Sequence, residues 1–513
     1  MRTLALSAGR SLRSRSVQAL LVVLLFVLPC VRCAFYAPNG DFAGVTTGGV
    51  QDMAYARRTI DDGDVPHPDS ITVEGLLSEH SIEIPLPDDP GLLYATAAAA
   101  WNQDFDELTP LVTVQVGFGT TIDAETFERR PQNLCLVVDA SRSMSDPIDY
   151  RTRTSKLEAV KIAIDRLMAQ LDVRDRVSLV SFAFAPRTRV ENVAGTNVRA
   201  IKEALDEIDA QDSTDLARGL ARGYSVAAEH AGGGRASRVI LFTDARVTSG
   251  TAEAKNFLEM MERNADDDIG ATIFGVGADF DDELAYDISQ VRGANLFFLN
   301  DYDRMVSVFD DEFDYLVTPV AFDVKLTAEV PFTFDVADAY GLPQIDTNTH
   351  LLELTIPTLF LSSREGGGAI LIRLRPGAQV TFDEELHAAT VELTFAEEPD
   401  AAPSTTKFEV VLPPDLDPDA AQPWFETPGV QRGVLLLNTA LVLKNACEDS
   451  YGSRDYWGDY VPRDRERARQ RLTEFLPYFD ALAEGLVDQP TPDSRALSQE
   501  RGVVERLLEN LSE

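Results

Sequence analysis

Short apolar runs alternate with amphipathic stretches through the middle of the chain, from about residue 133 to residue 316. The predicted strands are the runs at 134–138, 177–184, 239–242, 273–276 and 296–299. Fully apolar runs of this length are typical of a parallel sheet that is covered on both faces. Helices are predicted at 155–171, 198–208, 215–230, 252–264, 281–291 and 302–316. The alternation predicts right-handed crossovers and an α/β fold with a doubly wound, mostly parallel sheet.

The pattern changes on both sides of this region. Upstream, residues 54–85 carry a helical stretch and a proline-containing turn, and residues 110–117 alternate between apolar and polar side chains, as a half-buried strand does. Downstream of Thr318, antiparallel strands separated by Gly, Pro and Asp turns are predicted at 319–330, 350–356, 368–374, 388–395 and 406–412. Beyond Gly429, helices are predicted at 430–446, 464–486 and 496–512.

The length of 513 residues corresponds to about three domains. We therefore expect the α/β domain to be flanked by an antiparallel β-sandwich and a C-terminal helical region. The expected parts are an export signal at 1–33, an N-terminal region with strands of the sandwich at 34–131, the α/β domain at 132–316, the sandwich domain at 317–415, and a linker with the C-terminal helices at 416–513.

The first 33 residues have the pattern of a secretory signal peptide. Residues 1–18 are polar and carry arginines, and residues 19–29 form an unbroken apolar run. As a helix this run would rise only about 16 Å, whereas a bilayer core is about 30 Å thick. We predict cleavage before Ala34 and export to the periplasm, the outer surface or the medium.

The cysteines leave a second interpretation of this segment open. Cys30 or Cys33 could carry a lipid anchor, but the triplets that precede them fit a lipoprotein signal poorly, so plain secretion is favoured. After cleavage only Cys135 and Cys447 would remain, which excludes a disulfide framework. No later apolar segment is long enough to span a bilayer, so we expect no transmembrane span in the mature chain.

The charge balance limits the classes of partner. The chain has 46 Lys and Arg against 84 Asp and Glu, a formal net charge of −38. Nucleic-acid-binding proteins carry a basic surface, so DNA and RNA are not expected as partners, and neither are anionic lipids. Acidity of this kind is also explained by solubility or by adaptation to salt.

Oxygen-bearing side chains occur where the strands of the α/β region end. Asp139, Ser141 and Ser143 follow the first apolar strand at every second position, Thr214 comes just before a predicted helix, and Asp244 follows the strand at 239–242. Open α/β sheets bind ligands at the carboxyl ends of their strands. Carboxylate and hydroxyl oxygens are hard ligands, which favours Mg²⁺ or Mn²⁺ over zinc.

The order D-x-S-x-S, Thr before a helix and T-D after an apolar strand resembles a von Willebrand factor type A (VWA) domain, which has a Rossmann-like fold. The resemblance covers about residues 132–316 and implies that Asp139, Ser141, Ser143, Thr214 and Asp244 form a metal-ion-dependent adhesion site. The implied ion is Mg²⁺, with Mn²⁺ or Ca²⁺ as alternatives. In that family the serines and often the threonine bind the ion directly, and the aspartates bind it directly or through water.

Two positions depart from the family pattern. Its usual glycines are replaced by Arg142, between the two serines, and by Ala245, after Asp244. Neither glycine is a ligand, but a positive φ at either position would strain the backbone of this chain.

The resemblance implies an exported, Mg²⁺-dependent protein-binding or adhesion module in which an Asp or Glu carboxylate of a protein partner completes the metal site. Residues 56–74 also resemble the segment before the VWA domain in bacterial exported, often lipid-anchored VWA proteins. The alternative function is a scaffold or assembly factor, a chaperone-like VWA adaptor that organises an envelope complex.

In the VWA fold the first strand begins and the last helix ends on the face opposite the metal. We therefore expect 111–116 and 321–330 to pair in one sandwich, with the VWA domain as an insertion. An enzyme is not expected, because no G-x-S-x-G motif occurs and no general base is identifiable near the metal site. The histidines show no metal-ligand spacing and are predicted to be surface or packed residues: His67, His80, His230, His350 and His387.

Overall fold

The computed structural model describes residues 53–512 apart from short gaps. These gaps are residues 81, 86, 88–90, 123–126, 149–151, 212–213, 245–250, 278–287, 289, 300–301, 312, 342–348, 362–368, 381–383, 400, 415, 417–422, 455–459, 462 and 487–491. The predicted export signal at 1–33 and most of the predicted helix at 281–291 lie outside the described residues. Within the described residues, none of the helices combines the length and the apolar character needed to cross a membrane.

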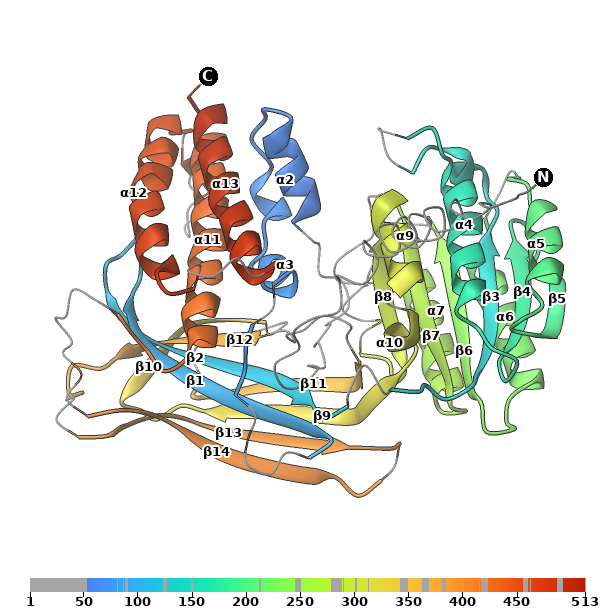
Figure 1. Cartoon of the computed structure of the whole chain (residues 1–513), viewed down its shortest axis with the longest axis horizontal. Helices are drawn as coiled ribbons and strands as arrows, with labels where there is room; N and C mark the ends of the chain where they lie inside the picture. The colour runs from blue at the N-terminus through green and yellow to red at the C-terminus, as the bar shows by residue number, and fades with distance from the viewer. Residues whose placement is uncertain are drawn as a thin grey trace, which may run out of the picture. The chain divides into compact units, whose positions relative to one another are not determined.

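A six-stranded mixed sheet forms the centre of the α/β region (Figure 1). Its strands, in spatial order, are β5 (Arg187–Ala194), β4 (Arg176–Phe182), β3 (Gln132–Asp139), β6 (Ala236–Thr243), β7 (Ile269–Val276) and β8 (Ala294–Leu299). All neighbours are parallel except β5, which runs antiparallel to β4. The five apolar runs are therefore strands of one sheet, and the edge strand β5 is an addition to the prediction. Its residues are exposed or half-buried, so it carries no apolar run.

Helices pack on both faces of this sheet, because successive residues of β3 point to opposite sides. Leu136 and Val138 belong to one core and Val137 belongs to the other. The first core includes α4 (Lys156–Ala169), α5 (Val198–Asp206), α9 (Tyr302–Asp311) and α10 (Phe313–Leu316). The second includes α6 (Leu216–Glu229) and α7 (Ala252–Ala265).

Two antiparallel sheets flank the α/β region in the sequence. The five-stranded sheet has the order β10 (Phe334–Tyr340), β12 (Ala369–Pro376), β2 (Pro110–Thr120), β1 (Leu93–Gln103) and β15 (Trp424–Phe425). The four-stranded sheet has the order β11 (Leu351–Phe360), β9 (Pro319–Glu329), β13 (Leu386–Ala396) and β14 (Ser404–Leu412). Side chains of both sheets, among them Val114 of β2 and Leu326 of β9, belong to one hydrophobic core.

The expectation that 111–116 and 321–330 pair is wrong. Strand β2 lies between β1 and β12, and β9 lies between β11 and β13, so each strand already has a neighbour on both edges. The two strands belong to different sheets and meet only through the core that the sheets share.

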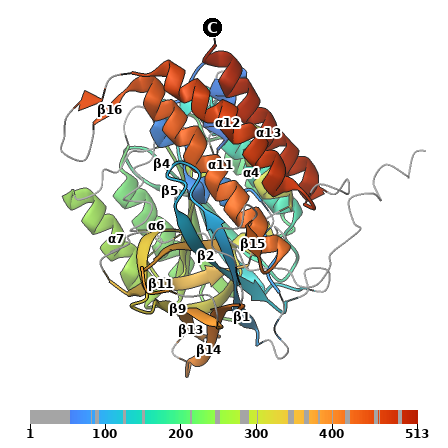
Figure 2. The same ribbon diagram turned by 90° about the vertical axis from the view of Figure 1, so that its left-hand side faces the viewer.

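The helices near both ends of the described chain form a third core. The C-terminal helices α11 (Pro428–Tyr451), α12 (Arg465–Ala483) and α13 (Pro492–Asn510) lie beside one another (Figure 2). The same core contains α2 (Ala54–Asp61) and α3 (Val73–Ser78), which are joined by the 3₁₀ helix η1 (Pro68–Ser70). A short ladder of β16 (Ser453–Arg454) and β17 (Tyr460–Val461) follows α11. The N-terminal region thus contributes strands to a sheet and helices to the C-terminal bundle.

The five-stranded sheet is covered on its outer face by α11. Ala98 and Ala100 of β1 share the helical core with α11, while Ala99 and Trp101 point into the core between the sheets. The approach is close at Gly433, because a Cβ atom there would overlap the side-chain oxygen of Gln115 on β2.

The buried side chain of Arg129 links the chain segment that enters the α/β region to the segment that leaves it. Arg129, which precedes β3, donates from both terminal nitrogens to the two carboxylate oxygens of Asp175, at 2.8 Å each. Its Nε donates to Asp314 of α10, the last helix before β9. The incoming and the outgoing segment are therefore tied together by one side chain.

Candidate metal centre

Asp139 is the fixed point of the predicted metal site. It ends β3, is fully buried, and accepts hydrogen bonds from the backbone N–H of Ser141 at 2.8 Å and from the hydroxyl of Thr243 at 2.6 Å. Because Thr243 ends β6, these bonds tie the carboxyl ends of the two neighbouring strands together. Burial raises the pKa of the Asp139 carboxyl, and the hydrogen bonds from Thr243 and Ser141 oppose that rise.

The two serines and Asp244 continue from Asp139 as one hydrogen-bonded network. The hydroxyl oxygens of Ser141 and Ser143 are 3.1 Å apart, and Ser143 donates to Oδ1 of Asp244 at 2.8 Å. The 3₁₀ helix η2 (Arg142–Ser145) places the serine hydroxyls side by side. Four of the five predicted site residues thus meet at one edge of the sheet, although Asp244 is about a hundred residues from the others.

Thr214 is the fifth predicted residue and lies exposed on the segment between α5 and α6. Two backbone bonds of 2.8 Å hold this segment at the same sheet edge, from Gln211 to Ala140 and from Asp215 to Ala183. Asp215 is the N-cap of α6, so Thr214 directly precedes the helix, as the sequence predicts.

The departures from the family pattern have different outcomes. Arg142 is the first residue of η2 and has a 3₁₀ backbone conformation that any L-amino acid adopts, so the backbone is not strained by a positive φ there. Ala245 lies outside the described residues.

Sequence reasoning missed Lys156, which belongs to this network. Its ammonium nitrogen lies 2.7 Å from Oδ2 of Asp244, and the two side chains are only 17% and 4% exposed. Lys156 is the first residue of α4, where a basic side chain is unfavourable because the positive end of the helix dipole lies there. A lysine at that position was therefore a signal that the sequence already contained.

The donor set fits a hard divalent cation. The network supplies carboxylate oxygens of Asp139 and Asp244 and hydroxyl oxygens of Ser141 and Ser143, with the Thr214 hydroxyl on the neighbouring loop. These are ligands that Mg²⁺, Mn²⁺ and Ca²⁺ prefer, whereas zinc sites use imidazole and thiolate. These five residues would hold the ion.

A second group of potential ligands lies elsewhere on the α/β region. Ligand atoms of Glu191, Glu229 and His230 all lie within 4.8 Å of one another, and both carboxylates are exposed. The Arg222 guanidinium is 3.5 Å from Glu229, so a cation already faces this group. We assign it no function.

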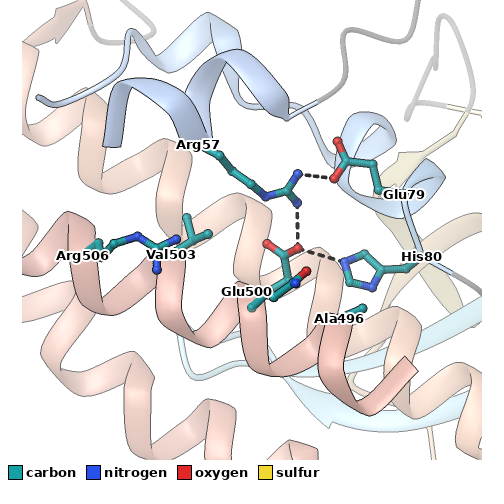
Figure 3. A pocket seen from close by; sticks show the side chains of 8 residues that line it. Arg57, Glu79, His80, Ala496, Glu500, Val503 and Arg506 are labelled. Atoms are coloured by element: carbon teal, nitrogen blue, oxygen red, sulfur yellow. Dashed lines mark hydrogen bonds and ion pairs between the residues drawn. The ribbon is translucent and has the colours of Figure 1, made fainter. Parts of the chain in front are cut away.

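A cavity of about 300 Å³ lies among α2, α3 and α13 (Figure 3). The buried Oε1 of Glu500 accepts from Arg57 at 2.7 Å and lies 3.1 Å from Nε2 of His80. Arg57 also pairs with Glu79. These contacts join the first described helices to the last one, and the prediction that His80 is a surface or packed residue is confirmed, because its side chain is buried.

The fold and the site together define a class: an open α/β domain whose central strands end in a cluster of hard oxygen ligands. Residues 134–246 match the family model of the von Willebrand factor type A domain, so the chain contains a VWA domain.

Two relatives share this part of the chain. The uncharacterized protein YfbK of Escherichia coli is 24% identical over 287 residues, which are 54% of this chain and 48% of that protein. The uncharacterized protein sll0103 of Synechocystis is 32% identical over 144 residues, 28% of this chain and 32% of that protein. The chain therefore spans about half the length of the first relative and about a third of the second.

Solved structures give weaker similarities. A von Willebrand factor type A protein from Catenulispora acidiphila is 14% identical, with a TM-score of 0.44 and coverage of 84% of this chain and 96% of that one. The pilus adhesin SpaC from Lactobacillus rhamnosus GG is also 14% identical, with a TM-score of 0.31 and coverage of 65% and 50%.

Proposed function

We propose that this chain is an exported, non-enzymatic protein-binding module whose VWA domain holds Mg²⁺ and binds an Asp or Glu carboxylate of a protein partner. The observation that carries the proposal is the network of Asp139, Ser141, Ser143 and Asp244 at the carboxyl edge of the sheet. VWA domains often mediate protein interactions or adhesion, and the apolar segment at 19–29 supports export.

The chemistry explains how an acidic protein can bind an acidic group. Mg²⁺ prefers about six oxygen ligands and, when bound, supplies a local positive charge to which a partner carboxylate is attracted. The formal charge of −38 is spread over the whole chain. At about 0.15 M salt, charges farther away than about 8 Å are largely screened, so over contact distance the local cation decides the sign of the interaction.

The residues of this chain have separate tasks in that interaction. Asp139 is held by hydrogen bonds from the Ser141 backbone and the Thr243 hydroxyl, whereas Ser143 is exposed. The proposed binding face is therefore the loop 141–146 together with Thr214 and Asp244.

A pull-down with the mature chain tests the proposal. The chain from Ala34 onward would be immobilised and exposed to envelope extract of the producing cell, with Mg²⁺ or with EDTA. We expect a partner that the wild type retains only with Mg²⁺ and that Asp139→Ala does not retain. Asp267→Ala is the matched control, because Asp267 is an exposed aspartate just before β7, at the opposite edge of the sheet from the candidate metal site, and should behave as wild type.

Mg²⁺ titration of the same proteins by calorimetry separates ion binding from partner binding. Partner retention that is equal in wild type and Asp139→Ala, with and without EDTA, would falsify the proposal. Such a result would favour the scaffold or assembly factor, whose contacts do not pass through the metal site.

A further inference from the structure

We infer that Lys156 is a built-in counter-ion of Asp244 that opposes the divalent cation and thereby sets the Mg²⁺ concentration at which the site fills. The inference rests on the proposed function, because it concerns the same site. It starts from the 2.7 Å ion pair between Nζ of Lys156 and Oδ2 of Asp244. Both side chains are largely shielded from water, so solvent screens their attraction less than it would on the surface.

The fold provides a place for this lysine. Gly277, just after β7, has a φ of +99°, and a Cβ atom there would lie 2.9 Å from Cε of Lys156. The backbone N–H of Lys156 donates to Asp146 at 2.9 Å, and Ser155 caps the helix by accepting from the N–H of Glu158 at 3.2 Å. The aliphatic part of the lysine is thus held beside a position that has no side chain.

Asp244 uses its two carboxylate oxygens for different partners. Oδ1 accepts from Ser143 within the candidate metal site, and Oδ2 faces the ammonium of Lys156. A divalent ion that binds near Oδ1 would lie close to a second positive charge at Oδ2. The two charges repel, and the ammonium also cancels one of the negative charges that would attract the ion.

Two opposite effects follow for a variant without the ammonium. Mg²⁺ should bind more tightly, by about tenfold or more, because a repulsion of even about 1.4 kcal/mol corresponds to that factor. A metal-free protein should melt at a lower temperature, because the buried Asp244 carboxylate would lose its cation. In the wild type, the ion pair with Lys156 therefore weakens metal binding but stabilises the Asp244 carboxylate when no metal is bound.

Calorimetric titration with MgCl₂ tests the first effect on the mature chain. Lys156→Met removes the charge and keeps the length of the side chain, and Lys156→Arg keeps the charge. Lys161→Met makes the same charge change further along α4 and is the matched control. We expect a Kd at least about tenfold lower for Lys156→Met, and values within about twofold of wild type for the other two variants.

Thermal melting in EDTA and in saturating Mg²⁺ tests the second effect. Lys156→Met should melt below wild type in EDTA and should gain more from Mg²⁺ than wild type does. If wild type and Lys156→Met bind Mg²⁺ equally, or if the variant melts like wild type in EDTA, the inference is wrong while the proposed function stands. If neither protein binds Mg²⁺, both the inference and the proposed function are wrong.

Discussion

The buried pair of Arg129 and Asp175 allows a sharp test of what stabilises the α/β region. Arg129 is 7% exposed and Asp175 is fully buried, and the Asp175 carboxylate also accepts from the N–H groups of Gln132 and Asp172 at 2.8 Å each. Arg129→Met would keep most of the packing and leave a buried carboxylate without its cation. Removing one partner of a buried ion pair costs about 3–5 kcal/mol.

Hydrogen exchange followed by mass spectrometry is the appropriate assay, because it reports on β3 alone in a chain of several cores. A loss of about 3–5 kcal/mol corresponds to faster exchange of the β3 amides by a factor of roughly 10² to 4 × 10³. The double variant Arg129→Met/Asp175→Asn removes both charges and should exchange at least about tenfold more slowly than Arg129→Met. Exchange of β3 in Arg129→Met within threefold of wild type would refute this reasoning.

The pH dependence of this pair has a definite sign. Burial disfavours the charged form of Asp175, but the hydrogen bonds from Arg129, Asp172 and Gln132 prevail and hold its pKa below the usual value. Its stabilising contribution is therefore complete above the unfolded-state pKa of about 3.9 and is lost as the pH falls through the lower folded-state pKa. Without Arg129, burial raises the pKa of Asp175, so the difference between wild type and Arg129→Met should shrink from pH 7 to pH 4.

Three further predictions follow from the structure. Glu500→Gln removes the negative charge that pairs with Arg57 and should lower the free energy of unfolding of the helical bundle by about 1–3 kcal/mol in calorimetry; an unchanged melting temperature would contradict this. Gly277→Ala should destabilise the protein by about 1–2 kcal/mol, because of its positive φ, and should alter Mg²⁺ affinity by displacing Lys156; identical titrations would exclude the second effect. Cys135 and Cys447 are buried, which raises the pKa of each thiol to about 12, so both should resist Ellman's reagent until denaturant is added.

The sequence predicts the α/β sheet well, because buried parallel strands need continuous apolar runs. The sequence does not predict a strand where the apolar run is missing. Strand β1 contains four consecutive alanines, which are poor strand formers, and two of them, Ala98 and Ala100, lie in the core shared with α11. The edge strand β5 is exposed and therefore carries charged residues instead of a buried apolar run.

The candidate metal site is also predicted only in part from the sequence. Asp139, Ser141, Ser143 and Asp244 could be brought together from sequence because carboxyl ends of neighbouring parallel strands meet at one edge. Lys156 stands out in the sequence only by its unfavourable place at the start of a helix, and the folded structure is needed to show that its side chain reaches Asp244. The wrong pairing of β2 with β9 has a similar cause, because alternation fixes which face of a strand is buried but not which strand lies beside it.

The bond network around Arg129 has a consequence for how this chain could change during evolution. Both ends of the α/β region are fastened at one point, through Asp175 and Asp314, so the region could be exchanged for a relative without separating the sheets between which it is inserted. Recombination at these two junctions would transplant the complete α/β region onto an unchanged support. The α/β region and its framework could therefore diversify independently, and grafting residues 129–316 into a related framework is the direct way to exploit that separation.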